Sequence, residues 1–166
     1  MRPWRRLGPA AWPFAVAVLL PLAAVGAALY TQYQLDMQPC PWCVLQRAIF
    51  VAIALAALPG LLVRLPALRK ASAGLALLLS VCGMAAALWQ HFVAASSTSC
   101  VQTLADKIMQ GSGLSERWPE VFAAYASCAD AAVNLFGQPY EFYSLALFTL
   151  LAVLMAAQVL ARNRRR

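Results

Sequence analysis

Four long stretches of this chain contain no Asp, Glu, Lys or Arg, and they constrain its fold more than any other feature. The stretches are Leu7–Leu35, Ala48–Val63, Ala71–Ala105 and Phe142–Ala161. A helix needs about 20 apolar residues to cross a bilayer core about 30 Å thick. Three stretches reach this length, and the second reaches it when it begins near Cys43. The sequence therefore predicts an all-α membrane protein, a four-transmembrane-helix bundle in one membrane domain covering residues 1–166.

The composition agrees with this class and gives approximate boundaries. Apolar residues make up 63% of the chain and charged residues 11%, whereas soluble domains carry about 25% charged residues. This excludes most soluble enzymes and a disordered tail. We expect membrane spans at about 11–31, 42–62, 71–95 and 142–161, with two loops on one side at about 32–41 and 96–141.

The charges indicate how the bundle lies in the membrane. Most of the cations flank the spans on a single side: Arg2, Arg5, Arg6, Arg64, Arg69, Lys70, Arg162, Arg164, Arg165 and Arg166. All six acids fall in the other two connections: Asp36, Asp106, Glu116, Glu120, Asp130 and Glu141. Because cation-rich short loops stay in the cytoplasm, we expect cytoplasmic N- and C-termini and two periplasmic loops. The net charge of +7 then reflects topology, and we expect no nucleic-acid partner.

The first span also resembles a secretory signal, because arginines precede an apolar run. Its charge-free run covers residues 7–35, which exceeds the about 7–15 residues of a signal core. We therefore expect an uncleaved first helix that stays in the membrane.

Four of the five cysteines fall in the predicted periplasmic loops or at their edges. Cys40 and Cys43 form a C-x-x-C motif, while Cys100 and Cys128 lie in the long second loop. The periplasm is oxidising, so cysteine pairs persist there as disulfides. A two-residue loop stabilises a fold weakly, and C-x-x-C motifs are typical of redox exchange. Cys82, in the middle of the third span, is interpreted as a small packing residue.

Cys43 is the cysteine with the most reactive predicted surroundings. It begins the second helix, where free N–H groups and the helix dipole favour an anion. Arg47 follows four residues later on the same face, and a cation at membrane depth usually marks a functional site. The alternative interpretation is an arginine that reaches the headgroups beside a structural disulfide.

These motifs resemble those of the DsbB family. The resemblance rests on Pro39-Cys40-x-x-Cys43-x-x-x-Arg47, on the second outer cysteine pair and on the four spans. Further matching pieces are Gln90-His91, Trp118-Pro119-x-Val121-Phe122 and Gln138-Pro139. Members of this family are bacterial inner-membrane proteins that reoxidise the periplasmic thiol oxidase DsbA and reduce a quinone.

The resemblance implies catalytic roles for Cys40, Cys43, Cys100, Cys128 and Arg47, and a quinone site at Cys43, Arg47 and His91. The quinone would be ubiquinone or menaquinone, and the partner a DsbA-like thioredoxin-fold protein. His91 would donate a hydrogen bond or proton, or would have no chemical role. Tyr140, Phe142 and Tyr143 are alternatives for an aromatic side chain beside the quinone. No metal is implied.

Several other interpretations compete with this one. The chain could be a membrane scaffold or assembly factor stapled by two inert disulfides, or a thiol-based redox sensor. Structural zinc is disfavoured because Cys100 and Cys128 are too far apart in sequence to form a second zinc knuckle.

The second loop contains a helical stripe of apolar residues: Trp118, Val121, Phe122 and Tyr125. It predicts a short amphipathic helix on the membrane surface or, alternatively, a stripe packed on the bundle.

Overall fold

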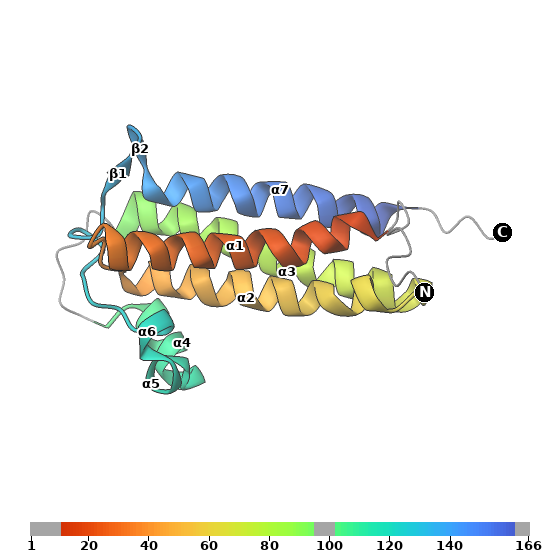
Figure 1. The fold of residues 1–166 in the computed structure, drawn as a ribbon, viewed down its shortest axis with the longest axis horizontal. Helices are drawn as coiled ribbons and strands as arrows, with labels where there is room; N and C mark the ends of the chain where they lie inside the picture. Colours follow the sequence, from red (N-terminus) through yellow and green to blue (C-terminus); the bar gives the residue numbers. More distant parts are fainter. Residues whose placement is uncertain (1–10, 95–101, 162–166) are drawn as a thin grey trace.

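Four long helices dominate the computed structural model, which describes residues 11–94 and 102–161 (Figure 1). They are α1 (Trp12–Gln34), α2 (Pro41–Leu62), α3 (Pro66–Trp89) and α7 (Tyr140–Leu160). A π-helical turn, η1 (Gln90–Ala94), continues α3. Each of the four helices is long and apolar enough to cross a membrane, which confirms the predicted fold class.

The four helices alternate in direction. The start of α1, the α2–α3 link and the end of α7 lie together at one end of the bundle (Figure 1). Helix α3 packs against both α2 and α7, while α1 packs mainly on α2. The short helices α4 (Leu104–Ser112), α5 (Leu114–Arg117) and α6 (Pro119–Phe122) lie beside α2 at the other end. A hairpin of β1 (Asn134–Leu135) and β2 (Gln138–Pro139) leads into α7.

The third helix begins earlier than its charge-free run indicates. It starts at Pro66, because proline fits the first turn of a helix, where its missing N–H is not needed. The Arg69 Nε then donates hydrogen bonds to the carbonyls of Gly60 and Val63, at 3.1 and 3.2 Å. This cation therefore satisfies the free carbonyls at the end of α2. Helix α3 thus begins ahead of residue 71, the approximate start expected for the third span.

The second loop differs from its predicted form. The stripe from Trp118 to Tyr125 yields only one helical turn, because α6 ends at Phe122. Both Trp118 and Tyr125 are exposed, and the Tyr125 N–H bonds the Pro39 carbonyl instead of continuing a helix. The longer helix is α4, which follows a Thr103–Asp106 capping box, a start signal that the sequence contained.

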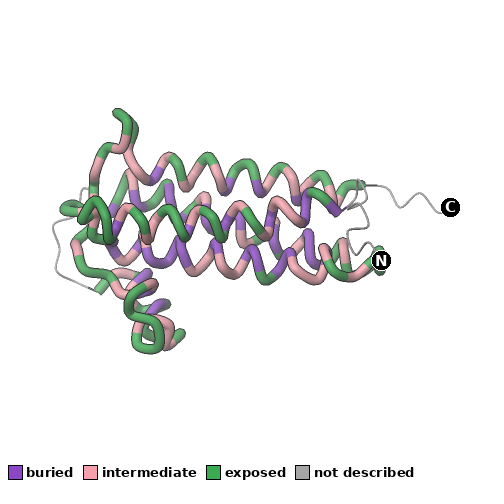
Figure 2. The backbone as a smooth tube through the Cα atoms, viewed as in Figure 1, coloured by how far each residue is buried: buried purple, intermediate pink, exposed green. Residues whose placement is uncertain are grey.

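A packed centre of buried residues holds the bundle together (Figure 2). Apolar side chains such as Leu19, Leu55 and Leu78 are exposed on its outside. The rings of Phe50 and Phe148 stack with their centroids 4.0 Å apart, and Phe148 lies directly over Gly83. Cys82 lies on α3 as expected, but its side chain is exposed. The interpretation of Cys82 as a packing residue is therefore wrong, because it lies on the outer face of the helix.

Gly83→Ala should destabilise the bundle by about 1–3 kcal/mol, the usual cost of overpacking a core. The added Cβ would overlap the Phe148 ring, whose other face is held by Phe50. Gly74→Ala is the matched control on the same helix, because a Cβ there meets nothing within 4 Å. Reversible unfolding in mixed micelles measures the free energy of unfolding of both variants. Equal stabilities would contradict the packing of Phe148 against Gly83.

Candidate functional site

The C-x-x-C motif lies at the first turn of α2, with Cys40 as the N-cap residue and Pro41 as the first helical residue. Cys40 is fully buried, and its sulfur lies 2.6 Å from that of Cys43. The Cys43 N–H donates to the Cys40 sulfur at 3.2 Å, as a helix N-cap requires. The helix start thus brings the two sulfurs into one reactive unit.

The second loop carries Cys128 onto this motif. The N–H groups of Tyr125 and Ala126 both donate to the Pro39 carbonyl, at 3.0 and 3.2 Å. The Tyr33 hydroxyl anchors the same loop by donating to the Glu120 carbonyl at 2.9 Å. These bonds join the two loops next to Cys40, so the buried Cys128 lies against the Cys40 sulfur.

The contact between Cys40 and Cys128 polarises both thiols. The Cys40 thiol donates to the Cys128 sulfur, which lowers the pKa of Cys128, and the Trp42 N–H lowers it further. Burial raises the pKa of Cys128, but this effect is smaller than the lowering by the Cys40 hydrogen bond. The same donation, first to Cys128 and then to Cys43, raises the pKa of Cys40. The contact thus shifts the pKa values of the two thiols in opposite directions. Cys100 lies outside the described residues.

Arg47 lies one turn below Cys43 on α2 and is buried against α1 and α6. Its Nη1 donates to Gln32 Oε1 at 2.6 Å and to the Val121 carbonyl at 3.1 Å. Its Nη2 donates to the Ala28 carbonyl at 3.3 Å. Neutral oxygens from α1 and α6 thus solvate the guanidinium. Because they carry no full charge, the positive charge of Arg47 stays available to an anion in the site.

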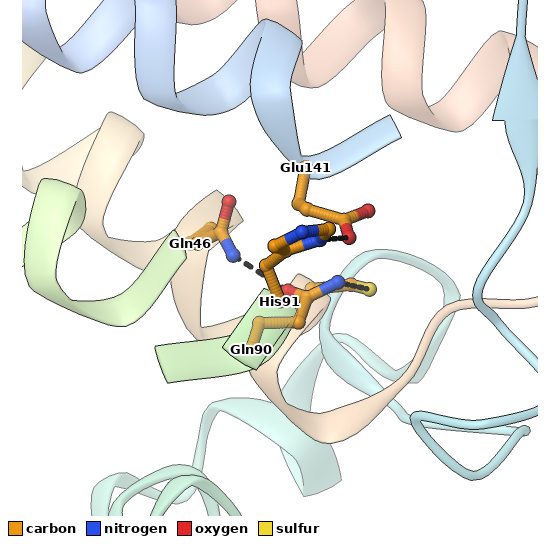
Figure 3. Close-up of polar contacts among 5 residues, drawn as sticks. Gln46, Gln90, His91 and Glu141 are labelled. Carbon is orange, nitrogen blue, oxygen red and sulfur yellow. Dashed lines mark hydrogen bonds and ion pairs between the residues drawn. The ribbon is translucent and has the colours of Figure 1, made fainter. Parts of the chain in front are cut away.

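Two glutamines form a second polar contact to Cys43. Gln46 Nε2 donates to Gln90 Oε1 at 2.7 Å, and Gln90 Nε2 points to the Cys43 sulfur at 3.4 Å (Figure 3). Gln46 comes from α2 and Gln90 from the first position of η1. The bonds therefore connect the motif to the end of α3.

His91 pairs with the first acidic residue of α7. Its Nδ1 lies 2.7 Å from Glu141 Oε1, within hydrogen-bond distance. The His91 ring also packs against Phe92 and Phe142. Glu141 is almost fully buried, whereas the His91 side chain is 29% exposed. The pair links a buried carboxyl group to the outside of the bundle.

A cavity of about 250 Å³ lies between α1, α2 and the start of α7, close to the lower end of the range of about 300–1,000 Å³ for small-molecule sites. Its mostly apolar wall carries a few polar groups, as such sites commonly do. The polar or reactive lining side chains are Thr31, Gln38, Cys43, Gln46, Arg47, Gln90, Tyr140, Glu141, Tyr143 and Ser144.

The cavity contains several of the sequence-predicted residues but not all. Cys43 and Arg47 line it, as do Tyr140 and Tyr143 of the three aromatic candidates. Phe142 packs on the His91 ring instead, and His91 approaches the cavity through Glu141. Sequence reasoning did not single out Gln32, Gln46 or Glu141. Polar residues within or next to membrane spans were the signal that could have found them.

These features define a class: a polytopic membrane protein with three cysteines, Cys40, Cys43 and Cys128, gathered at one end of its helix bundle. Comparison with known proteins names the family within that class. The family model described as Disulfide bond formation protein DsbB matches residues 10–158. The chain belongs to the DsbB family, and it is a multi-pass inner-membrane oxidoreductase of disulfide bond formation.

Individual relatives cover most of the chain. Disulfide bond formation protein B 1 of Pseudomonas syringae pv. syringae is 35% identical over 148 residues, which span 87% of this chain and 86% of the relative. Disulfide bond formation protein B of Aromatoleum aromaticum is 35% identical over 146 residues, 84% of this chain and 86% of the relative. That of Ralstonia nicotianae is 31% identical over 162 residues, 92% and 95% of the two chains.

The position of Cys128 can be tested by trapping. In a variant that keeps only Cys40 and Cys128, a mild oxidant should form a disulfide between them rapidly, because the two side chains are already in contact. In the matched variant that keeps only Cys43 and Cys128, the bond should form at least about tenfold more slowly, since disulfides demand narrow geometry. Maleimide labelling followed by electrophoresis measures both rates. Equal rates would contradict the observed placement of Cys128.

Proposed function

We propose that this protein transfers electrons from a reduced DsbA-type periplasmic thiol oxidase, through two cysteine pairs, to a membrane quinone. The observation that carries the proposal is the continuous path from Cys128 to Cys40 to Cys43, which ends at a cavity that Cys43 and Arg47 line. A structural disulfide needs no such cavity. A buried cation beside the terminal sulfur is likewise unnecessary in a disulfide-stapled scaffold.

The thiol chemistry begins in the second loop. A thiolate of the partner attacks the Cys100 sulfur in a Cys100–Cys128 disulfide, and Cys128 leaves as a thiolate. The Trp42 N–H, which lowers the pKa of Cys128, favours this departure. The Cys128 thiolate then attacks Cys40, the Cys40–Cys43 bond breaks, and Cys43 leaves as a thiolate.

The remaining exchanges return the second loop to its starting state. The partner's second thiolate attacks its sulfur bound to Cys100, which releases the oxidised partner and a Cys100 thiolate. That thiolate attacks Cys128, re-forms the Cys100–Cys128 bond and frees Cys40. The net result is one oxidised partner, with its two electrons and two protons now on the Cys40–Cys43 dithiol.

The cavity residues fit a quinone headgroup. When bound, a quinone supplies an acceptor for two electrons and two protons. The apolar wall suits its ring, and Tyr140 and Thr31, whose hydroxyl oxygens lie 3.3 Å apart, offer hydrogen bonds. Arg47 stabilises negative charge that develops beside Cys43, because a fixed cation acts strongly in a dry site. His91 and Glu141 hold a proton between Nδ1 and Oε1 at the cavity edge.

The energetics favour a strongly oxidising acceptor. DsbA has a potential of about −120 mV, and each 30 mV uphill costs about 1.4 kcal/mol for two electrons. Few acceptors other than a respiratory quinone can therefore oxidise it. The charge pattern supports the required orientation, because the cation-rich segments are the cytoplasmic ones by the positive-inside rule. The C-x-x-C motif and Cys128 would then face the periplasm.

Arg47→Ala should lower quinone reduction by about 10²- to 10³-fold, the usual cost of removing one group that stabilises an anion in a dry site. The assay follows quinone absorbance with purified protein, a ubiquinone or menaquinone analogue and reduced DsbA. Arg64→Ala is the control, because Arg64 is exposed in the α2–α3 link. The scaffold alternative predicts no turnover in the parent protein and no effect of either substitution.

Glu141→Gln should keep the contact with His91 but remove the carboxyl group that carries a proton. We expect turnover to fall by about 10²-fold, within the range for general acid–base catalysis, and the solvent deuterium isotope effect to change. Glu116→Gln makes the same chemical change at an exposed site and should leave both readouts unaltered. Unchanged turnover in Glu141→Gln would argue against a proton-carrying role.

A further inference from the structure

We propose that Gln90 is a catalytic residue that stabilises the Cys43 thiolate through its amide N–H, and that Gln46 fixes the orientation of that amide. The inference rests on the proposed function and assigns roles to two side chains that the cysteine relay itself does not use. It begins from their burial, since Gln46 is 3% and Gln90 4% exposed. A buried amide without partners costs several kcal/mol, so the partners of these two groups are defined by the fold.

The orientation follows from the chemistry of an amide group. An amide side chain has a donor end and an acceptor end. Gln46 donates its Nε2 to Gln90 Oε1 at 2.7 Å, which occupies the acceptor end of Gln90. The donor end of Gln90 must then point the other way, and it lies 3.4 Å from the Cys43 sulfur (Figure 3). Gln46 therefore determines which end of Gln90 faces Cys43.

The bond gains strength when Cys43 becomes an anion. Hydrogen bonds to a charged acceptor are about twice as strong as neutral ones, so the Gln90 N–H favours the thiolate over the thiol. The hydrogen bonds of Arg47 go to Gln32, Ala28 and Val121. The guanidinium thus acts on Cys43 through its field, while Gln90 supplies a directed donor.

The local backbone explains how Gln90 reaches this position. It is the first residue of η1, the π-helical turn that ends α3. Such turns are rare and frequent at functional sites. In this one, two consecutive side chains both reach inward: Gln90 contacts Cys43, and His91 contacts Glu141. The same turn thereby serves the sulfur and the proton-carrying pair.

The test measures Cys43 reactivity in quinone-free, full-length protein in which Cys43 is the sole cysteine. Gln90→Met keeps the side-chain length but removes the N–H donor, so alkylation of Cys43 by iodoacetamide at neutral pH should slow about tenfold. In Gln46→Glu, the new carboxylate offers only hydrogen-bond acceptors to Gln90. The Gln90 amide should therefore turn its N–H group toward this carboxylate and its carbonyl oxygen toward the Cys43 sulfur. This variant should slow alkylation at least as much as Gln90→Met.

The double variant separates an effect through Gln90 from direct repulsion by a new carboxylate. If Gln46 acts through Gln90, then Gln46→Glu combined with Gln90→Met should be no slower than Gln90→Met alone, a non-additivity expected of coupled residues. Gln34→Leu, at an exposed position of α1, is the control and should react like the parent. Melting temperatures establish that each variant is folded.

The outcomes distinguish this inference from the proposed function. Unchanged alkylation in folded Gln90→Met, or a double variant much slower than either single one, would overturn the roles assigned to the glutamines. Slower alkylation in a protein that reduces no quinone would overturn the proposed function and leave the glutamine roles intact. In an active protein, the long-wavelength absorption of a thiolate beside a quinone should weaken in Gln90→Met and Gln46→Glu but persist in Gln34→Leu.

Discussion

The site depends on a constraint that the membrane imposes: a polar group buried in an apolar bundle must find its partner within the protein. Arg47 meets this demand with oxygens of α1 and α6, and Gln46 meets it with Gln90 at the end of α3. His91 meets it with Glu141 of α7. These bonds connect all four long helices at one end, which is the end that carries the C-x-x-C motif. Stability and chemistry therefore draw on the same contacts.

The loops add a second connection of the same kind. The Pro39 carbonyl accepts two N–H groups of the second loop, immediately before Cys40 in the chain. An irregular segment with unpaired backbone groups would be costly near the apolar bundle. Pairing it with the first loop satisfies those groups and brings Cys128 to Cys40. The proposed electron path thus depends on backbone hydrogen bonding as much as on the cysteines.

The sequence predicted what depends on local pattern and missed what depends on distant partners. Charge-free runs located the four helices, and the four-residue spacing placed Arg47 below Cys43. The pairing of Gln46 with Gln90 joins residues 44 apart in sequence, and no periodicity encodes such a contact. The Trp118 stripe forms only one helical turn for a related reason, because Tyr125 bonds to the distant Pro39 carbonyl rather than to its own helix. The capping box of α4 and the polar residues next to the membrane spans were local signals left unused.

The distribution of charge within the site suggests how it is kept ready for an anion. The carboxyl group of Glu141 is paired with His91, and the guanidinium of Arg47 is surrounded by neutral oxygens. A carboxylate bound directly to Arg47 would compensate its charge and weaken its effect on Cys43. Glu141 lies on α7 and contacts His91, so it does not neutralise the charge of Arg47 on α2. In the proposed mechanism, the positive field then acts on the Cys43 thiolate that electron transfer creates, while Glu141 carries the proton.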